Sequence, residues 1–113
     1  MSRHESMVRL RHMLDHAREA VAIAKGKTRD DLHTDRILNL ALVRLLEIVG
    51  EAASRTLLDE RAQHSDIPWA QIIGLRNRLI HGYDSVDFEI LWQIVNHDLP
   101  NLIVKLEQIV SSA

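Results

Sequence analysis

An arginine, an amide, an imidazole and a phenol lie close together in one short segment of the sequence: Arg76, Asn77, His81 and Tyr83. Histidine exchanges protons near neutral pH, and the planar, five-donor arginine side chain suits a phosphate. Cleaving RNA without a metal ion requires both abilities, because the 2′-hydroxyl of RNA can itself be the nucleophile. These residue types point to phosphodiester chemistry, with His81 moving protons and Arg76 stabilising phosphate charge.

The same side chains are also compatible with a structural role. An arginine and a histidine near a helix end often form ion pairs, caps or contacts with carbonyl groups. In addition, one histidine cannot easily be both the acid and the base of a reaction. A symmetric dimer that brings two copies of Arg76 and His81 together would remove this difficulty. Spacing alone leaves both interpretations open.

Residues 69–83 are predicted to form one helix that presents these groups. Its apolar residues fall on one stripe: Trp69, Ile72, Ile73, Leu79 and Ile80. Arg76 lies in the middle of this stripe, so a carboxylate of the protein or an external phosphate should meet its guanidinium. Asn77 and His81 are four residues apart and would be neighbours on the adjacent ridge. Gly82 can end the helix, which leaves His81 in the last turn.

The preceding helix is a possible source of the acid that meets Arg76. A polar ribbon runs along it at spacings of three and four residues: Arg44, Glu47, Glu51 and Arg55. These residues could form ion pairs within the helix, or one acid could orient Arg76 or His81. Glu51 is the better candidate, because Gly50 beside it permits close approach by another helix. Residues 37–53 are apolar over more than half the circumference, which indicates a central helix or an additional oligomer interface.

The hydrophobic pattern predicts helices along the whole chain, without the alternation typical of strands. Helices are predicted over residues 3–24, 28–58 with a break near His33 and Thr34, 69–83, and from 88 to about 111 with a break or kink before Pro100. Candidate caps are Thr28, then Ser65 or Asp66, then Ser85 or Asp87. Residues 59–65 and 84–87 are predicted connections. We therefore expect one domain over residues 1–113, an all-α bundle of four or five helices with no sheet.

Composition excludes several classes of protein. The chain has 113 residues, a net charge of −2 and no cysteine, so disulfides and thiolate chemistry are absent. No apolar run is long enough for a membrane span and the N-terminus lacks the apolar core of a signal peptide, which favours a cytoplasmic location. His12 and His16 are four residues apart but have no evident third ligand, and no acidic cluster suits two metal ions. The sequence predicts neither a metal nor another cofactor.

The segment from Arg76 to His81 matches the motif of HEPN domains, an arginine, four residues and a histidine. With Gly82 and Tyr83, it resembles the extended form typical of HepT-like toxins. Other segments fit the family in order and spacing: Leu46 to Ala53, Ile67 to Trp69, Trp92, and Asp98 to Pro100. The resemblance covers nearly the whole chain.

This resemblance implies a helical bundle that dimerises, with both motifs facing one composite cleft. It implies a metal-independent ribonuclease in which Arg76 and His81 are essential and Asn77 positions them. It further implies a toxin whose partner, a minimal nucleotidyltransferase of the MntA type, neutralises it by transferring AMP to Tyr83. Arg78 and Glu51 are possible supporting residues.

Two other interpretations stay open at this point. The chain could be a non-catalytic module that binds a nucleotide or presents Tyr83 to a nucleotidyltransferase. It could also be a purely structural dimer subunit in which Arg76 pairs internally with Glu51.

Overall fold

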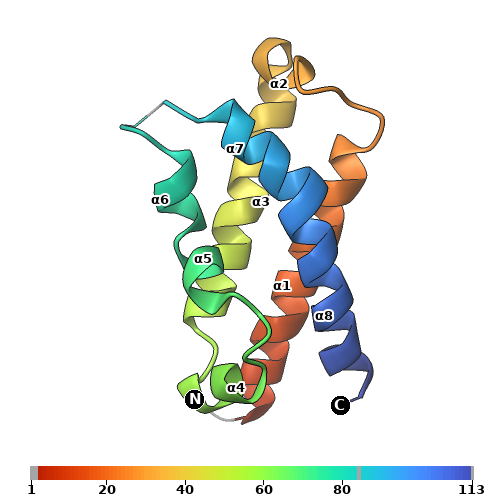
Figure 1. Ribbon diagram of the computed structural model, residues 1–113, viewed down its shortest axis with the longest axis vertical. Coiled ribbons are helices and arrows are strands. Elements are labelled where there is room, and N and C mark those ends of the chain that lie inside the picture. Colours follow the sequence, from red (N-terminus) through yellow and green to blue (C-terminus); the bar gives the residue numbers. More distant parts are fainter. Residues whose placement is uncertain (1–2, 84, 113) are drawn as a thin grey trace.

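Two long helices pair along the length of the molecule, and shorter helices lie against them (Figure 1). The computed structural model describes residues 3–83 and 85–112. The helices, in chain order, are α1 (Arg3–Ala24), α2 (Asp31–Thr34), α3 (Arg36–Ser54), α4 (Leu58–Gln63), α5 (Trp69–Ile73), α6 (Leu75–Leu79), α7 (Phe88–Gln93), the π-helix η1 (Ile94–Asp98) and α8 (Leu99–Ser111). The predicted all-α fold is confirmed, because the described residues contain no strand and only one isolated bridge, between Ile80 and Val86. Asp84, part of the predicted loop after Tyr83, lies outside the described residues.

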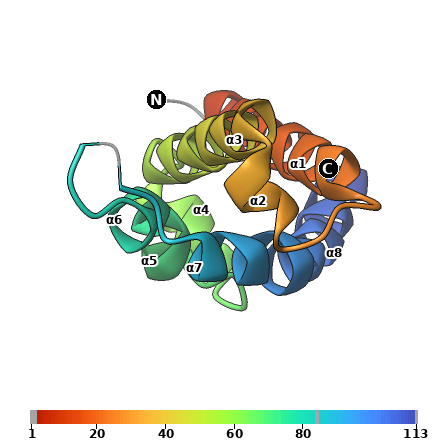
Figure 2. The same ribbon diagram turned by 90° about the horizontal axis from the view of Figure 1, so that it is seen from above.

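The helices form two layers. The long helices α1 and α3 run in opposite directions in one layer, and α5, α6 and the rod α7–η1–α8 form the other (Figures 1 and 2). The interior between them is built largely of fully buried leucines: Leu10, Leu42, Leu46, Leu79, Leu91, Leu99 and Leu106. Because α3 packs against α1 as well as α5 and α6, it is the central helix that its apolar sequence predicts. Within the described part of the chain, no helix is both long and apolar enough to cross a bilayer.

The first two turns of α3 leave apolar side chains uncovered. Ile37 is 81% exposed and Leu40 is 51% exposed. Their neighbours Leu38 and Leu42 point into the core and are buried. The helix is therefore apolar on two sides, as its sequence indicates, but this chain covers only one of them at this end.

Aspartate side chains cap two of the described helices, Asp35 at α3 and Asp87 at α7. The Oδ1 atom of Asp87 accepts a hydrogen bond from the backbone nitrogen of Ile90 at 3.1 Å, which confirms one predicted cap. Thr28 Oγ1 accepts from the backbone nitrogen of Asp31 at 3.3 Å in the turn before α2, but the N-cap residue of α2 is Asp30, whose side chain makes no capping hydrogen bond. The predicted cap at Ser65 or Asp66 is wrong, since Pro68 precedes α5 and no side chain caps it.

The predicted single helix over residues 69–83 is wrong at two places. It is interrupted at Gly74, and it ends at Leu79. Beyond that point Ile80 is extended, with φ −106° and ψ 119°. The returning chain competes with the helix for backbone partners, because the nitrogen of Asp87 donates to the carbonyl of Leu79 at 2.8 Å. This contact comes from a residue eight positions further along the chain, so local helix propensity cannot predict it.

Two other helix ends also differ from the predictions. The central helix ends at Ser54 instead of running to residue 58, and α4 replaces much of the predicted connection. Arg61 holds this corner by donating from Nη2 to the carbonyl of Ser54 at 2.7 Å. Near Pro100 the helix widens into the π-helix η1 and continues as α8. The wider turn accommodates a proline ring that would otherwise clash with a carbonyl one turn earlier.

Candidate functional site

Helix α6 and the loop after it form one exposed edge of the molecule. The buried side chains of Leu75 and Leu79 hold α6 against the core. Helix α5 approaches α3 closely, because a Cβ atom at Gly50 would lie only 2.9 Å from the carbonyl oxygen of Ile72. The predicted close approach at Gly50 is confirmed, and it fixes the position from which α6 projects.

Arg76 lies on this edge and is exposed, with 67% of its side chain accessible, rather than embedded among apolar side chains. Its Nε donates to Oε2 of Glu47 at 3.2 Å. Glu51, the predicted partner, instead accepts from Nε of Arg55 at 2.7 Å. The prediction missed the correct acid by one helical turn, because the interruption at Gly74 changes the direction in which Arg76 projects. Both terminal nitrogens of the guanidinium have no acceptor among the described residues.

A pocket of about 230 Å³ lies beside Arg76, between α3 and the α5–α6 segment. Asn77 lines it together with Glu47 and Glu51, and Gly50 lies in its floor. Asn77 is exposed and contributes to the lining of this space. The structure therefore brings Arg76, Asn77 and Glu51 to one pocket, although Glu51 does not bind Arg76. Asn77 and His81 are not neighbours on one helix, because α6 ends between them.

His81 is held by a short antiparallel contact rather than by a helix. Its backbone nitrogen donates to the carbonyl of Ser85 at 2.6 Å. Its Nε2 lies 3.7 Å from Oδ2 of Asp87, and 60% of the side chain is exposed. The carboxylate of Asp87 therefore faces the imidazole at a distance beyond that of a direct hydrogen bond. Sequence reasoning assigned Asp87 only a capping role, although its place six residues beyond His81, across a glycine-containing turn, signals such a contact.

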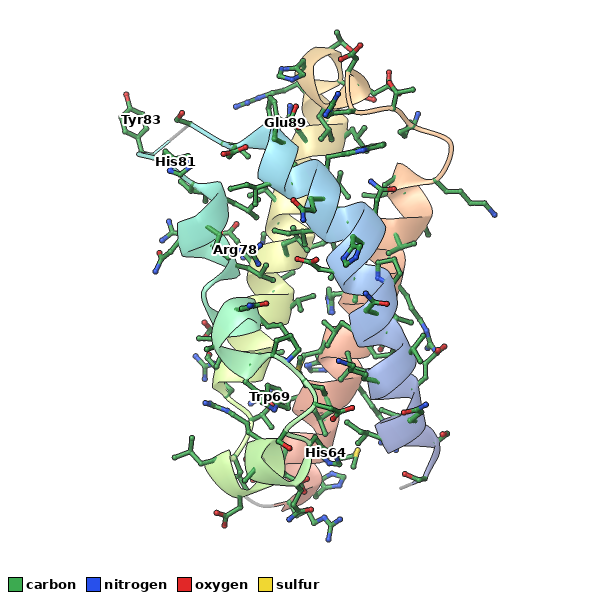
Figure 3. The ribbon with its side chains drawn as sticks, in the orientation of Figure 1. His64, Trp69, Arg78, His81, Tyr83 and Glu89 are labelled. Carbon is green, nitrogen blue, oxygen red and sulfur yellow. The ribbon has the colours of Figure 1, made fainter. Side chains whose placement is uncertain are left out.

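Tyr83 stands on the loop and is 99% exposed. Figure 3 shows His81 and Tyr83 projecting away from the bundle on the same side. Gly82 between them has a φ of +94°, a conformation that other residues adopt only at a cost. The phenol therefore reaches solvent beside the imidazole.

Arg78 belongs to a different surface. Its Nη2 lies 3.7 Å from Oδ2 of Asp98 in η1, and only 38% of the side chain is exposed. Figure 3 shows Arg78 well below the loop that carries His81. Helix α6 thus separates two cations, with Arg76 directed to α3 and Arg78 directed to η1.

The described residues contain no obvious metal site. Over residues 3–83 and 85–112, no three His, Cys, Asp or Glu side chains are grouped so that they could hold an ion. His12 and His16 lie near each other, with ring centroids 6.3 Å apart, but Nδ1 of His16 contacts the carbonyl oxygen of His12 at 2.7 Å. One of the four ring nitrogens is therefore already engaged by the backbone.

Known proteins resemble this chain over most of its length. The family described as "Ribonuclease HepT-like" matches residues 7–109, a segment that includes the whole edge from α6 to Tyr83. The chain belongs to the HepT-like ribonuclease family. The HepT-like resemblance inferred from the motif is thereby confirmed, together with the helical fold expected from it.

Named relatives of this HepT-like chain come from bacteria and archaea. It is 35% identical to "Putative RNase TTE0752" of Caldanaerobacter subterraneus subsp. tengcongensis, across 88% of this chain and 89% of the relative. It is 32% identical to "Putative RNase MJ1380" of Methanocaldococcus jannaschii, across 95% of this chain and 98% of the relative. It is also 35% identical to "Probable ribonuclease HepT" of Thermococcus cleftensis, across 85% and 91% respectively. No solved structure matches the HepT-like chain significantly.

Proposed function

We propose that this HepT-like protein is an endoribonuclease toxin that cleaves RNA as a homodimer and without a metal ion. The observation that carries the proposal is the exposure of three reactive side chains along one edge. Arg76 and His81 have side chains that are 67% and 60% exposed, and Tyr83 is 99% exposed. A large polyanion can reach all three without any part of the bundle opening.

The proposed reaction uses the RNA as its own nucleophile. The 2′-oxygen of one ribose attacks the adjacent phosphorus, and the bond from phosphorus to the 5′-oxygen of the next nucleotide breaks. One His81 accepts the proton of the 2′-hydroxyl, and a second His81 donates a proton to the departing 5′-oxygen. Arg76 neutralises the charge that develops on the phosphate, while Asn77 orients the phosphate beside it.

The surrounding acids suit these roles. Asp87, 3.7 Å from Nε2 of His81, places a carboxylate beside the ring that exchanges the protons. Glu47 engages Arg76 through Nε only, so the terminal nitrogens are left for a phosphate. An exposed ion pair of this kind contributes little free energy, about 0–1 kcal/mol, and an entering phosphate can compete with it.

The second histidine comes from a second copy of the chain. Ile37 and Leu40 form an exposed apolar patch on α3, the helix that also carries Glu47 beside Arg76. Burial of this patch against its symmetric counterpart would remove apolar surface from water. Such a dimer would bring two copies of the α6 edge toward one cleft.

Cleavage in the presence of a chelator tests the function. We expect the purified protein to cut single-stranded RNA at an unchanged rate in EDTA, because no step uses a metal ion. The new ends should be a 2′,3′-cyclic phosphate and a 5′-hydroxyl, which mass spectrometry of the products identifies. RNA left intact by the folded dimer, or products with 5′-phosphate ends, would contradict the proposal.

We further propose that a minimal nucleotidyltransferase of the MntA type silences the toxin by modifying Tyr83. The phenol oxygen attacks the α-phosphorus of ATP, pyrophosphate leaves and the phenol loses its proton. The added phosphate and nucleoside then lie beside His81, where their charge and bulk oppose the entry of RNA. Tyr83 is the single tyrosine of the chain, so an adduct on tyrosine has only one possible position.

Intact-mass measurement after incubation with such a nucleotidyltransferase and ATP should show a gain of one or more AMP units. The gain should disappear in Tyr83→Phe, because the nucleophilic oxygen is lost while the exposed ring stays. Ser85→Ala removes a hydroxyl on the same loop and should keep the full gain. AMP addition to Tyr83→Phe would refute the assignment.

The pairing of Arg76 with Glu47 favours one second candidate function. In this candidate, the protein is a non-catalytic module in which Arg76 is held by its acid partner. The exposed edge would then bind a nucleotide or present Tyr83 to a nucleotidyltransferase. Calorimetry with mononucleotides and a nuclease assay on one preparation separate the two candidates. Tight nucleotide binding without cleavage favours the module.

A further inference from the structure

A cavity of about 170 Å³ lies on the side of α6 opposite Arg76, between the α5–α6 segment and the rod η1–α8. Its walls include the buried apolar residues Leu75, Ile94 and Leu102. At about 30 Å³ per water molecule in the liquid, a volume of about 170 Å³ corresponds to roughly five or six waters, the space of one small ring system. The cavity suits one flat ring rather than a helix or a strand.

Two basic side chains contribute to the lining of this cavity. Arg78 and Lys105 both line it. The carboxylate paired with Arg78, that of Asp98, is 3.7 Å away, which is beyond hydrogen-bond distance. Lys105 donates from Nζ to the backbone carbonyl of Asp66 at 2.7 Å, so its charge is not neutralised by that contact. Arg78 and Lys105 therefore bring two positive charges to the cavity against the one carboxylate of Asp98, and the net positive charge favours an anionic group there.

One wall of the cavity is formed by a π-helix rather than by a regular α-helix. The π-helix η1 supplies His97 and Asp98, and the next turn of α8 supplies Asn101. Nδ1 of His97 lies 3.2 Å from Oδ1 of Asp98. Single π-turns inside α-helices are frequent at functional sites, because they shift side chains away from the regular helical positions. Asp98 and Asn101 bring a carboxylate and an amide to the lining of this largely apolar cavity, and both kinds of group can hydrogen-bond the edge of a nucleobase.

We propose that this cavity binds one nucleoside monophosphate unit, with the base on the apolar floor and the phosphate between Arg78 and Lys105. The cavity and Arg76 lie on opposite sides of α6, so the unit bound is a nucleotide of the same single-stranded RNA that lies across α6 from the scissile phosphate. This assignment rests on the proposed ribonuclease function for its substrate. The pocket chemistry itself, a base plus a phosphate, is the same for a free mononucleotide.

The test uses a pair of substitutions at Asn101, an exposed residue on α8. Asn101→Glu adds a carboxylate four residues before Lys105, where it pairs with the ammonium and repels phosphate, while the pairing itself is favourable in a helix. Asn101→Gln has the same size without the charge and is the matched control. Lys27→Gln, in the exposed turn after α1, controls for the loss of a positive charge elsewhere.

Binding is measured by NMR titration of the labelled full-length protein with AMP and with a short, fully 2′-O-methylated oligoribonucleotide, which cannot be cleaved. We expect both ligands to shift resonances of η1 and the first turns of α8. Asn101→Glu should weaken oligonucleotide binding about tenfold relative to Asn101→Gln, the loss of one charge-assisted contact. Lys27→Gln should bind as the unsubstituted protein does.

The titrations test two claims separately, that the cavity binds a nucleotide and that this nucleotide belongs to the RNA substrate. Equal binding by Asn101→Glu and Asn101→Gln, or shifts confined to other surfaces, overturns the pocket. Binding of AMP without binding of the oligonucleotide overturns the flanking-nucleotide assignment and identifies a free-nucleotide site. Since the oligonucleotide is not cleavable, these results are independent of the cleavage assay, which reports separately on the proposed function.

Discussion

Replacing His81 with alanine should lower the rate of RNA cleavage by about 10²–10⁴-fold, the usual contribution of a general acid or base. In the proposed dimer, the substitution removes the proton-transfer group from both copies, so the two proton transfers are lost together. The rate is measured with a fluorescently labelled single-stranded RNA under conditions in which the protein is in excess.

Folding should be almost unaffected by His81→Ala. The side chain is 60% exposed, and its one described ion-pair partner, Asp87, lies 3.7 Å away. Circular dichroism and the denaturation midpoint establish that the variant is folded before its activity is compared. His12→Ala removes another exposed histidine, on α1, and should retain full activity. Equal rates of RNA cleavage by His81→Ala and His12→Ala would contradict the proposed role of His81 in proton transfer.

Replacing Gly50 with valine should lower the free energy of unfolding by about 1–3 kcal/mol, the usual cost of overpacking a tight contact. The Cβ atom alone would lie 2.9 Å from the carbonyl oxygen of Ile72, a backbone atom that cannot rotate away. To relieve this contact, α5 has to move off α3. Chemical denaturation monitored by circular dichroism measures the change through the shift of the midpoint.

The neighbouring substitution Glu51→Val is the matched control for Gly50→Val. It introduces the same side chain one residue along α3, on the exposed face, and removes only the ion pair with Arg55. Its cost should be below about 1 kcal/mol, the sum of a weak exposed ion pair and a modest difference in helix propensity. If both variants unfold at the same midpoint, the contact between Gly50 and Ile72 is not as tight as its geometry indicates.

The long helices could be predicted from the sequence because their signals are local. The stripe of α1 and its end before Gly26 were predicted within the bounds observed, and α8 ends at Ser111 as expected. The segment from Trp69 to Tyr83 was not predicted correctly. Its apolar spacing is helical, but the backbone partners that end α6 come from residues 85–87, which the spacing does not encode.

The candidate site shows the same division. Residue type alone selected Arg76 and His81, and both lie on one exposed edge. Their acid partners depend on how helices meet in space. Arg76 pairs with Glu47 and not with the predicted Glu51, because the interruption at Gly74 changes the direction of the arginine side chain. Asp87 lies beside His81 only because the loop after α6 turns back.

The bridge between Ile80 and Val86 joins the two ends of the loop that carries Tyr83. Tyr83 therefore lies in the part of the loop beyond this backbone bridge, and a group attached to its phenol displaces no buried atom. If Tyr83 is modified as proposed, AMP can therefore be added to this phenol, or hydrolysed from it, without unfolding of the bundle. A protein molecule from which the AMP group is removed would regain the proposed ribonuclease activity without new synthesis and without refolding by a chaperone.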